Sequence, residues 1–262
     1  MTAPRRTPRR SPVVMALVAL VALVAIAGLA GLAYLFLRPA APAAVGLATN
    51  APGASATAGG SLPAGTAAAG GSATIGPGGL SGTWTIDQTI GLFSDFSDSF
   101  VGYRVNETLA QNKANTAVGR TAQVNGTLVL DGTSITSVDV IANLQRLKSD
   151  DDRRDGRLHD QAIETDLFPT SEFKLTTPID LGTAPVDGQT ITETATGELT
   201  LHGVTKSVQV AIEARLSGDV VTVTGSVNIV FADYDIQRPT SFLVLSIEDH
   251  GVMEFQLHFR HS

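Results

Sequence analysis

The chain has 262 residues, a formal net charge of -7 and no cysteine. Without cysteine it can form no disulfide bond, no thiolate metal site and no lipid-modified N-terminal cysteine. Residues 1–45 contain five arginines and no acidic residue, so the remaining residues carry 13 basic and 25 acidic side chains, a net charge of -12. A domain this acidic repels nucleic acid and anionic membrane surfaces, which excludes nucleic acid as a partner.

An uncharged apolar run extends from Val13 to Leu37. As a helix, these 25 residues would span roughly 37 Å, more than the hydrocarbon core of about 30 Å in a typical bilayer. Four arginines precede the run and only Arg38 follows it. This bias places the N-terminus in the cytoplasm and the rest of the chain outside. We therefore expect a cytoplasmic basic tail at residues 1–12 and a single-pass anchor in the cell membrane at residues 13–37.

A cleavable signal peptide is the alternative interpretation of this run. Small residues suited to cleavage follow at 41–44, which read Ala-Pro-Ala-Ala. The run is nevertheless longer than the ~7–15 residues of a signal-peptide core, which favours its retention as an anchor. Within it, Ala27 and Gly31 have a small-xxx-small spacing that supports helix pairing, so the sequence leaves a homodimer open.

Residues 39–81 contain no charged side chain and consist almost entirely of Ala, Gly, Pro, Ser and Thr. A segment of this composition buries too little apolar surface to fold. We therefore predict a disordered linker at residues 38–81, with an end-to-end distance on the order of 35–40 Å for a flexible coil. It would act as a tether, and the domain at residues 82–262 should fold without it.

Apolar and polar residues alternate over most of residues 82–262, which is typical of β-strands. A helix is predicted only at 153–164, where Leu158, Ala162 and Ile163 have helical spacing. The predicted strands are 83–87, 101–105, 124–130, 137–144, 173–181, 191–201, 208–216, 220–231 and 252–260. Antiparallel strands at this spacing indicate an all-β fold, a closed barrel or sandwich of about eight strands with one inserted helix.

The stretch from Leu199 to Lys206 reads Leu-Thr-Leu-His-Gly-Val-Thr-Lys. It resembles the signature of the YceI-like family of lipid- or polyisoprenoid-binding proteins. Further similarities follow the family order: the strand around Trp84, the residues from Arg154 to Leu158, and Phe168-Pro169 with Phe173. The resemblance covers about residues 82–262. It implies a lipocalin-like eight-stranded barrel that binds a polyisoprenoid, an isoprenoid quinone or a similar lipid.

The size of the inward side chains decides whether such a barrel is hollow. A barrel of about eight strands is either filled by side chains or holds one small ligand. Small inward residues such as Gly126 and Ala142 would leave an elongated apolar cavity, although they could equally pack a flattened core. From the alternation we predict lipid-binding, cavity-lining roles for Val101, Tyr103, Val105, Leu144, Phe173, Leu201, Ile212, Val223 and Phe255.

The chain lacks the sequence signatures of the common catalytic and metal sites. It has no Gly-x-Ser-x-Gly nucleophile elbow and no His-Glu-x-x-His pair. The acidic stretch that begins at Asp151 departs from a calcium loop at its third and twelfth positions, and we interpret it, with the arginines that follow, as a solvated charge cluster. His202 lies on the face of a threonine-rich strand, where a structural or surface role is expected. We predict no catalytic residue, no metal site and no cofactor.

Three functions are compatible with these features. The first is a membrane-anchored, extracytoplasmic protein that binds a long-chain amphiphile inside its barrel. The second is a structural or stress-response envelope protein with a filled barrel, acting through protein contacts. The third, an enzyme acting on a lipid, lacks a convergent nucleophile and base, so we expect a non-enzymatic protein.

Overall fold

The computed structural model describes residues 40–47, 79–241 and 244–262. The predicted cytoplasmic tail and transmembrane anchor lie outside these residues, as does most of the predicted linker. Within the described residues, no helix has both the length and the apolar character needed to cross a bilayer. The anchor at residues 13–37 therefore stays a prediction.

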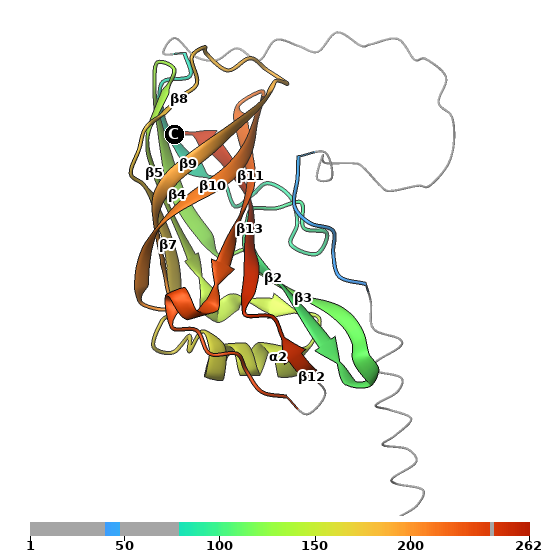
Figure 1. Ribbon diagram of the computed structural model, residues 1–262. Helices are drawn as coiled ribbons and strands as arrows, with labels where there is room; N and C mark the ends of the chain where they lie inside the picture. The colour runs from blue at the N-terminus through green and yellow to red at the C-terminus, as the bar shows by residue number, and fades with distance from the viewer. Residues whose placement is uncertain (1–39, 48–78, 242–243) are drawn as a thin grey trace, which may run out of the picture.

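Eight antiparallel strands of the described chain close into a barrel with one inserted helix, which confirms the predicted architecture (Figure 1). Strand β1 pairs with β13, from Trp84 opposite His261 to Ile86 opposite Phe259, and this pairing closes the ring. In order around the barrel, the strands are β1 (Gly82–Ile86), β4 (Val124–Asp131), β5 (Ser134–Asn143), β7 (Thr170–Leu175), β9 (Thr190–Leu201), β10 (Val204–Ser217), β11 (Val220–Val230) and β13 (His250–His261).

Strand β13 changes partner along its length. Residues 252–256 pair with β2 (Phe100–Leu109), whereas residues 259–261 pair with β1. Consequently β2 and its neighbour β3 (Lys113–Thr121) leave the ring as a two-stranded ribbon at the end where the helix lies (Figure 1). The remaining strands are short: β6 (Lys148–Ser149) beside β3, β8 (Ile179–Asp180) beside β5 and β12 (Val244–Ile247) beside β2.

Helix α2 (Asp152–Arg157) continues into a wider turn, η3 (Leu158–Ala162), so the predicted helix lies in the expected place but ends earlier. Asp151 caps it by accepting a hydrogen bond of 2.9 Å from the amide of Arg153, which satisfies an otherwise unpaired donor. Three single 3-10 turns occur elsewhere: η1 (Ala110–Asn112), η2 (Leu144–Arg146) and η4 (Phe231–Tyr234).

Several predicted strand boundaries were wrong. The strand predicted at 173–181 is two strands, β7 and β8, and Leu144 lies in η2 rather than at the end of β5. The predicted strand 220–231 ends at Val230, because Phe231 begins η4. Three strands of the described chain, β3, β6 and β12, were not predicted.

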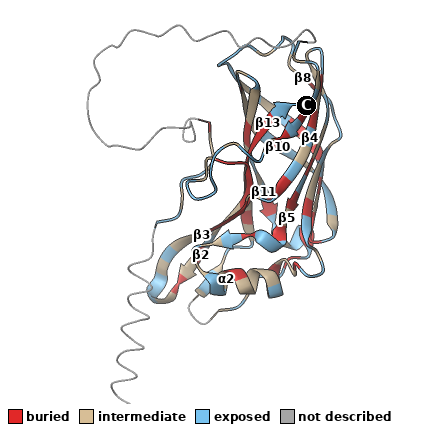
Figure 2. Cartoon of the chain, turned by 180° about the vertical axis from the view of Figure 1, so that it is seen from behind, coloured by how far each residue is buried: buried red, intermediate tan, exposed pale blue. Residues whose placement is uncertain are grey.

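The outer face of β13 is buried, although its alternation suggests a solvated face. Glu254, Gln256 and His258 expose at most 3% of their surface. A loop at residues 91–99 covers the last two: Gln256 Nε2 donates to the Asp98 carbonyl at 2.9 Å, and His258 Nε2 lies 2.9 Å from the Ser97 carbonyl. Figure 2 shows buried positions along the barrel strands.

Residues 40–47, which we call the strap, lie along the outside of β13, β2 and β3. The carbonyl of Pro42 accepts a hydrogen bond of 2.8 Å from Arg104, and that of Ala43 accepts one of 3.2 Å from Arg120. The amide of Val45 lies 3.4 Å from Glu254 Oε2, and Leu47 is 7% exposed. The prediction that all of residues 38–81 form a disordered linker is therefore wrong for the strap.

A buried ion pair explains this docking. Arg120 donates to Glu254 Oε1 at 2.7 Å and 3.1 Å, and both side chains are nearly inaccessible to water. The guanidinium also stacks on Phe96 and Phe100, with its central carbon 4.4 and 4.3 Å from the ring centres. A buried pair is stable only when its remaining donors find acceptors, and a strap carbonyl supplies one.

Candidate functional site

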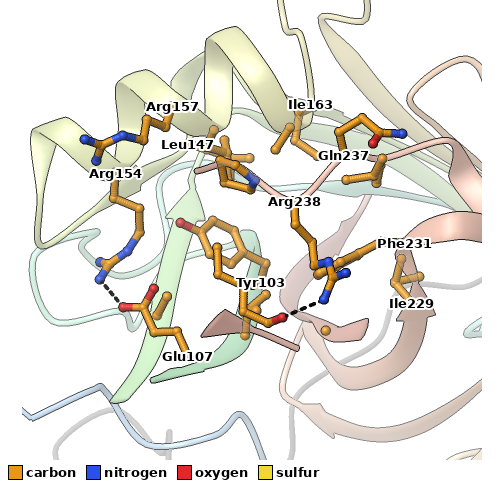
Figure 3. Close-up of a pocket in the computed structure, with 18 of the residues that line it drawn as sticks. Tyr103, Glu107, Leu147, Arg154, Arg157, Ile163, Ile229, Phe231, Gln237 and Arg238 are labelled. Atoms are coloured by element: carbon orange, nitrogen blue, oxygen red, sulfur yellow. Dashed lines mark hydrogen bonds and ion pairs between the residues drawn. The ribbon is translucent and has the colours of Figure 1, made fainter. Parts of the chain in front are cut away.

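A cavity of about 390 Å³ opens at the helix end of the barrel. Its walls come mainly from β2, α2, η3, β12, β13 and the residues that follow η4, with single residues from β3, η2, β9, β11 and η4. Figure 3 shows members of this lining, among them Tyr103, Arg154 and Arg238. Most of the lining is aliphatic or aromatic. The members that β2, β13 and the helical segment contribute include Val101, Tyr103, Val105, Leu158, Ile163 and Met253, and Leu147 follows η2.

Two smaller cavities continue this space along the barrel. A cavity of about 130 Å³ shares Val101 and Met253 with the first. A third, of about 60 Å³, shares Leu128 and Ile212 with the second and reaches Trp84 at the far end. We refer to them as the first, second and third cavities. Neighbouring cavities share lining residues, so the three together form an apolar column along the barrel.

All nine residues predicted to line the cavity face this column. The first cavity is lined by Val101, Tyr103, Val105, Leu144 and Leu201. The second is lined by Val101 again and by Phe173, Ile212, Val223 and Phe255. Lining the column does not establish that these residues bind a lipid, and that role stays a proposal.

The two small residues singled out from the sequence differ in their surroundings. Ala142 lines the second cavity. Gly126 does not, because Ile86 Cδ1 lies 3.1 Å from the position where its Cβ would be. The expectation that Gly126 leaves space for a ligand was therefore wrong; it leaves space for a core side chain.

Glycines on neighbouring strands explain why the aromatic residues do not fill the barrel. A Cβ at Gly225 would lie 2.5 Å from Cζ of Phe255, its cross-strand partner, and one at Gly197 would lie 2.5 Å from Cζ of Phe173. The rings therefore lie against bare backbone in the wall. A side chain at either glycine would push its ring toward the lumen.

Glu193 and Arg215 border the third cavity, and six charged side chains line the opening of the first cavity. Four are basic, Arg153, Arg154, Arg157 and Arg238, and two are acidic, Glu107 and Asp151. Arg154 bridges Glu107 at 3.0 Å and Asp150 at 2.5 Å, and Arg238 donates to the Ile247 carbonyl at 3.1 Å (Figure 3). The charge cluster predicted to be solvated is partly buried, since the side chains of Asp151 and Arg154 are 10% and 15% exposed.

Tyr103 lines the first cavity, and its hydroxyl lies beside Gly119 in the wall. Its hydroxyl is buried and has no hydrogen-bond partner among the described residues. Burial raises the pKa of the Tyr103 phenol above its ordinary value, so the group is a neutral hydroxyl. A buried hydroxyl without a partner is destabilising.

His202 has a structural role and does not line the column. It sits with Gly203 in the β9–β10 turn, where both residues have positive φ, 51° and 74°. Its Nδ1 lies 2.9 Å from the Tyr234 carbonyl, its Nε2 lies 3.2 Å from Glu164 Oε2, and its ring packs on Phe168. No histidine lines the three cavities described above.

Sequence reasoning missed the part of the first cavity formed by irregular segments. Ile236, Pro239 and Val244 lie after η4 or in β12, where no strand or helix period marks an inward face. Leu158, Ala162 and Ile163 did carry a signal, because their helical spacing predicted one apolar face. That face lines the opening.

Comparisons with known proteins agree with the barrel. A family model described as the YceI-like domain matches residues 84–259. A solved polyisoprenoid binding domain from Saccharophagus degradans, implicated in plant cell wall breakdown, is 18% identical with a TM-score of 0.52, over 68% of this chain and 98% of that one.

Two further solved structures are less similar. Burkholderia cenocepacia BcnA is 16% identical with a TM-score of 0.47, over 61% of this chain and 95% of that one. A Campylobacter jejuni YCEI protein is 17% identical with a TM-score of 0.43, over 53% of this chain and 81% of that one. None of the curated proteins is significantly similar in sequence to this chain.

Proposed function

Because the chain belongs to the YceI-like domain family, we propose that its barrel binds a long-chain amphiphile, such as a polyisoprenoid or an isoprenoid quinone. The observation that carries this proposal is the column of three apolar cavities with common walls. Its length and aliphatic lining suit a flexible hydrocarbon chain. The S. degradans structure, described as a polyisoprenoid binding domain, supports the same ligand class.

The opening and the column suit the two ends of such a molecule. The first cavity falls within the roughly 300–1,000 Å³ of typical ligand sites, which combine apolar walls with a few polar groups. The hydrocarbon tail would enter toward Phe255 and Trp84. The polar head would stay near Tyr103 and the arginines of the opening.

The alternative functions fit the cavities less well. A structural protein with a filled barrel predicts no column, whereas the first cavity alone has a volume of about 390 Å³. An enzyme needs a nucleophile with a base within reach, and no histidine lines the column. Binding without chemistry is the function that these residues support best.

The proposed place of binding is the outer face of the cell membrane. The apolar run at residues 13–37 would anchor the chain, and the arginines that precede it would keep the N-terminus in the cytoplasm. The barrel would then be extracytoplasmic. This part of the proposal rests on the sequence.

The single tryptophan allows a direct test of the proposed binding. Trp84 is 3% exposed and lines the third cavity, at the far end of the column. Titration with a polyprenol that carries bromine near the end of its tail should quench Trp84 fluorescence in a saturable manner. A matched analogue of one or two isoprene units should not, because it cannot reach from the opening to Trp84. Absence of saturable quenching by the long molecule would contradict the proposal.

A further inference from the structure

The strap begins at the same end of the barrel as the opening of the first cavity. Ala40 and Ala41 border a groove together with residues 106–108 of β2, 113–116 of β3 and Ser246 of β12. Glu107 lies in this groove and also at the cavity opening. In Figure 1 the strap (blue) lies beside the barrel with one end toward the β2–β3 ribbon, and α2 and β12 lie below it.

The chain leaves little distance between the strap and the proposed anchor. The apolar run ends at Leu37, and only residues 38 and 39 separate it from Ala40. Because a residue spans at most about 3.3–3.6 Å, this connection reaches roughly 10 Å. The point of attachment to the barrel is therefore the strap, not residue 82 at the end of a long tether.

We propose that the strap holds the barrel with its cavity opening facing the bilayer that contains residues 13–37, so that a lipid passes from the outer leaflet into the column. The partner surface is the membrane itself. This inference rests on the proposed function, because it assigns the source of the ligand and the route by which it enters.

Exposed apolar side chains occur at this end of the barrel. Leu245 of β12 is 60% exposed, while its neighbours Val244 and Ile247 line the first cavity. Leu167, in the loop after η3, is 69% exposed. Apolar side chains on a membrane-facing end would lie in the lipid interface, where their exposure has no cost.

The distribution of charge also fits this orientation. The chain after residue 45 carries a net charge of -12, which would repel an anionic membrane surface. The lining of the opening, however, contains four arginines and only two acidic residues. Arg157 makes no hydrogen bond or ion pair with any other described residue. Arg154 is paired with Glu107 and with Asp150, which lies outside the cavity lining.

The absence of natural cysteine makes the orientation measurable in the full chain. A fluorophore attached at Leu245→Cys would report the opening, and one at Val186→Cys would report the loop before β9 at the opposite end. The two positions are matched in exposure, at 60% and 62%. The full chain is placed in vesicles of phosphatidylethanolamine and phosphatidylglycerol that carry a phospholipid with a quenching doxyl group near its headgroup. The expected result is loss of fluorescence at Leu245→Cys and none at Val186→Cys.

A strap variant tests the cause of the orientation. Leu47→Asp places a carboxylate at a buried position, which should release the strap, whereas Leu47→Met should keep it. In the Leu47→Asp background the quenching at Leu245→Cys should fall to that at Val186→Cys. Equal quenching at both ends of the barrel, or none at either end, in the chain with its natural strap would overturn the proposal.

The lipid content of the same preparations separates this inference from the proposed function. Native mass spectrometry shows whether the barrel carries lipid, whatever its orientation. Bound lipid without quenching at Leu245→Cys would overturn the orientation and leave binding intact. Quenching at Leu245→Cys without bound lipid would support the orientation and contradict binding.

Discussion

The phenol ring of Tyr103 lies against Gly119, its cross-strand partner on β3. A Cβ at Gly119 would lie 2.8 Å from Cζ of Tyr103, so only glycine leaves room for the ring in the wall. Phe255 lies against its cross-strand partner Gly225 in the same way, and Phe173 lies against Gly197, whose cross-strand partner on β7 is Leu175. Three large side chains are thereby kept out of the lumen, which is why the barrel contains an apolar column.

Gly119→Ala should move the Tyr103 ring into the first cavity. The added methyl group overlaps the ring, and overpacking of this kind costs about 1–3 kcal/mol of unfolding free energy. We expect lower stability in urea and less bound lipid. Gly156→Ala is the matched control, because a Cβ there meets nothing within 4 Å and φ is not positive. A Gly119→Ala protein with unchanged stability and lipid content would show that the ring does not need the glycine.

Ala142→Phe distinguishes a hollow barrel from a filled one. Ala142 lines the second cavity, of about 130 Å³. In a filled core the larger ring would cost about 1–3 kcal/mol or more. In this barrel we expect the ring to enter the column, with a smaller loss of stability and with displacement of the lipid tail. Thermal unfolding and lipid analysis of the same sample check both effects. An unfolded variant, together with a natural protein free of lipid, would favour the structural alternative.

Removal of the strap should destabilise the barrel. A chain that begins at residue 79 lacks the carbonyls that accept from Arg104 and Arg120, and it lacks the buried side chain of Leu47. Burial of a leucine contributes about 1.5–3 kcal/mol, and ordering the strap offsets part of it. Compared with a chain that begins at residue 39, the melting temperature should fall by several degrees. Equal melting temperatures would support the fully disordered linker that composition predicts.

Asp98 should make the barrel less stable as the pH rises. Asp98 is 8% exposed, and one of its carboxylate oxygens has no hydrogen-bond partner among the described residues. Burial raises the pKa of Asp98 to about 6. The folded state therefore holds this proton more tightly than the unfolded state, whose pKa is about 3.9. The contribution of Asp98 to the free energy of unfolding is therefore greatest below about pH 4 and falls as the pH rises to about 6.

The substitution Asp98→Asn isolates this effect from other titrating groups. It should raise the midpoint of urea unfolding at pH 7 and leave it nearly unchanged at pH 4. The comparison matters because burial lowers the pKa of the nearby His258, which acts in the opposite direction. A variant less stable than the natural protein at pH 7 would mean that the ionised carboxylate has a partner.

The proposed topology has its own test. A reporter enzyme that is active only outside the cytoplasm, fused after Ser262, should be active when the full chain is expressed. An inactive fusion produced in full amount would contradict both the orientation of the anchor and the extracytoplasmic place of the barrel.

Alternation predicted the barrel well where one strand face is apolar and the other polar. Met253, Phe255, Leu257 and Phe259 of β13 alternate with other residues in the sequence, and all four line the column. Strand β3 was missed because its sequence, Lys-Ala-Asn-Thr-Ala-Val-Gly-Arg-Thr, has no apolar period. It is a strand because it pairs with β2.

Long-range contacts were beyond the reach of sequence patterns. Nothing in the composition of residues 40–47 distinguishes them from the rest of the linker, apart from Val45 and Leu47. Their docking depends on Arg120 and Glu254, which are far away in sequence and meet only in the folded barrel. The pairing of aromatic rings with glycines likewise depends on strand register. Alternation could place Tyr103 on the inner face but could not show that its ring lies in the wall.

Native mass spectrometry of the full chain, isolated from the membrane in which it was produced, tests the central claim most directly. The account predicts added mass in the range of a single long-chain lipid, released by organic solvent and diminished in the Ala142→Phe variant. A protein whose mass equals that of the polypeptide alone, in a preparation that melts cooperatively, would contradict the claim that the column holds an amphiphile.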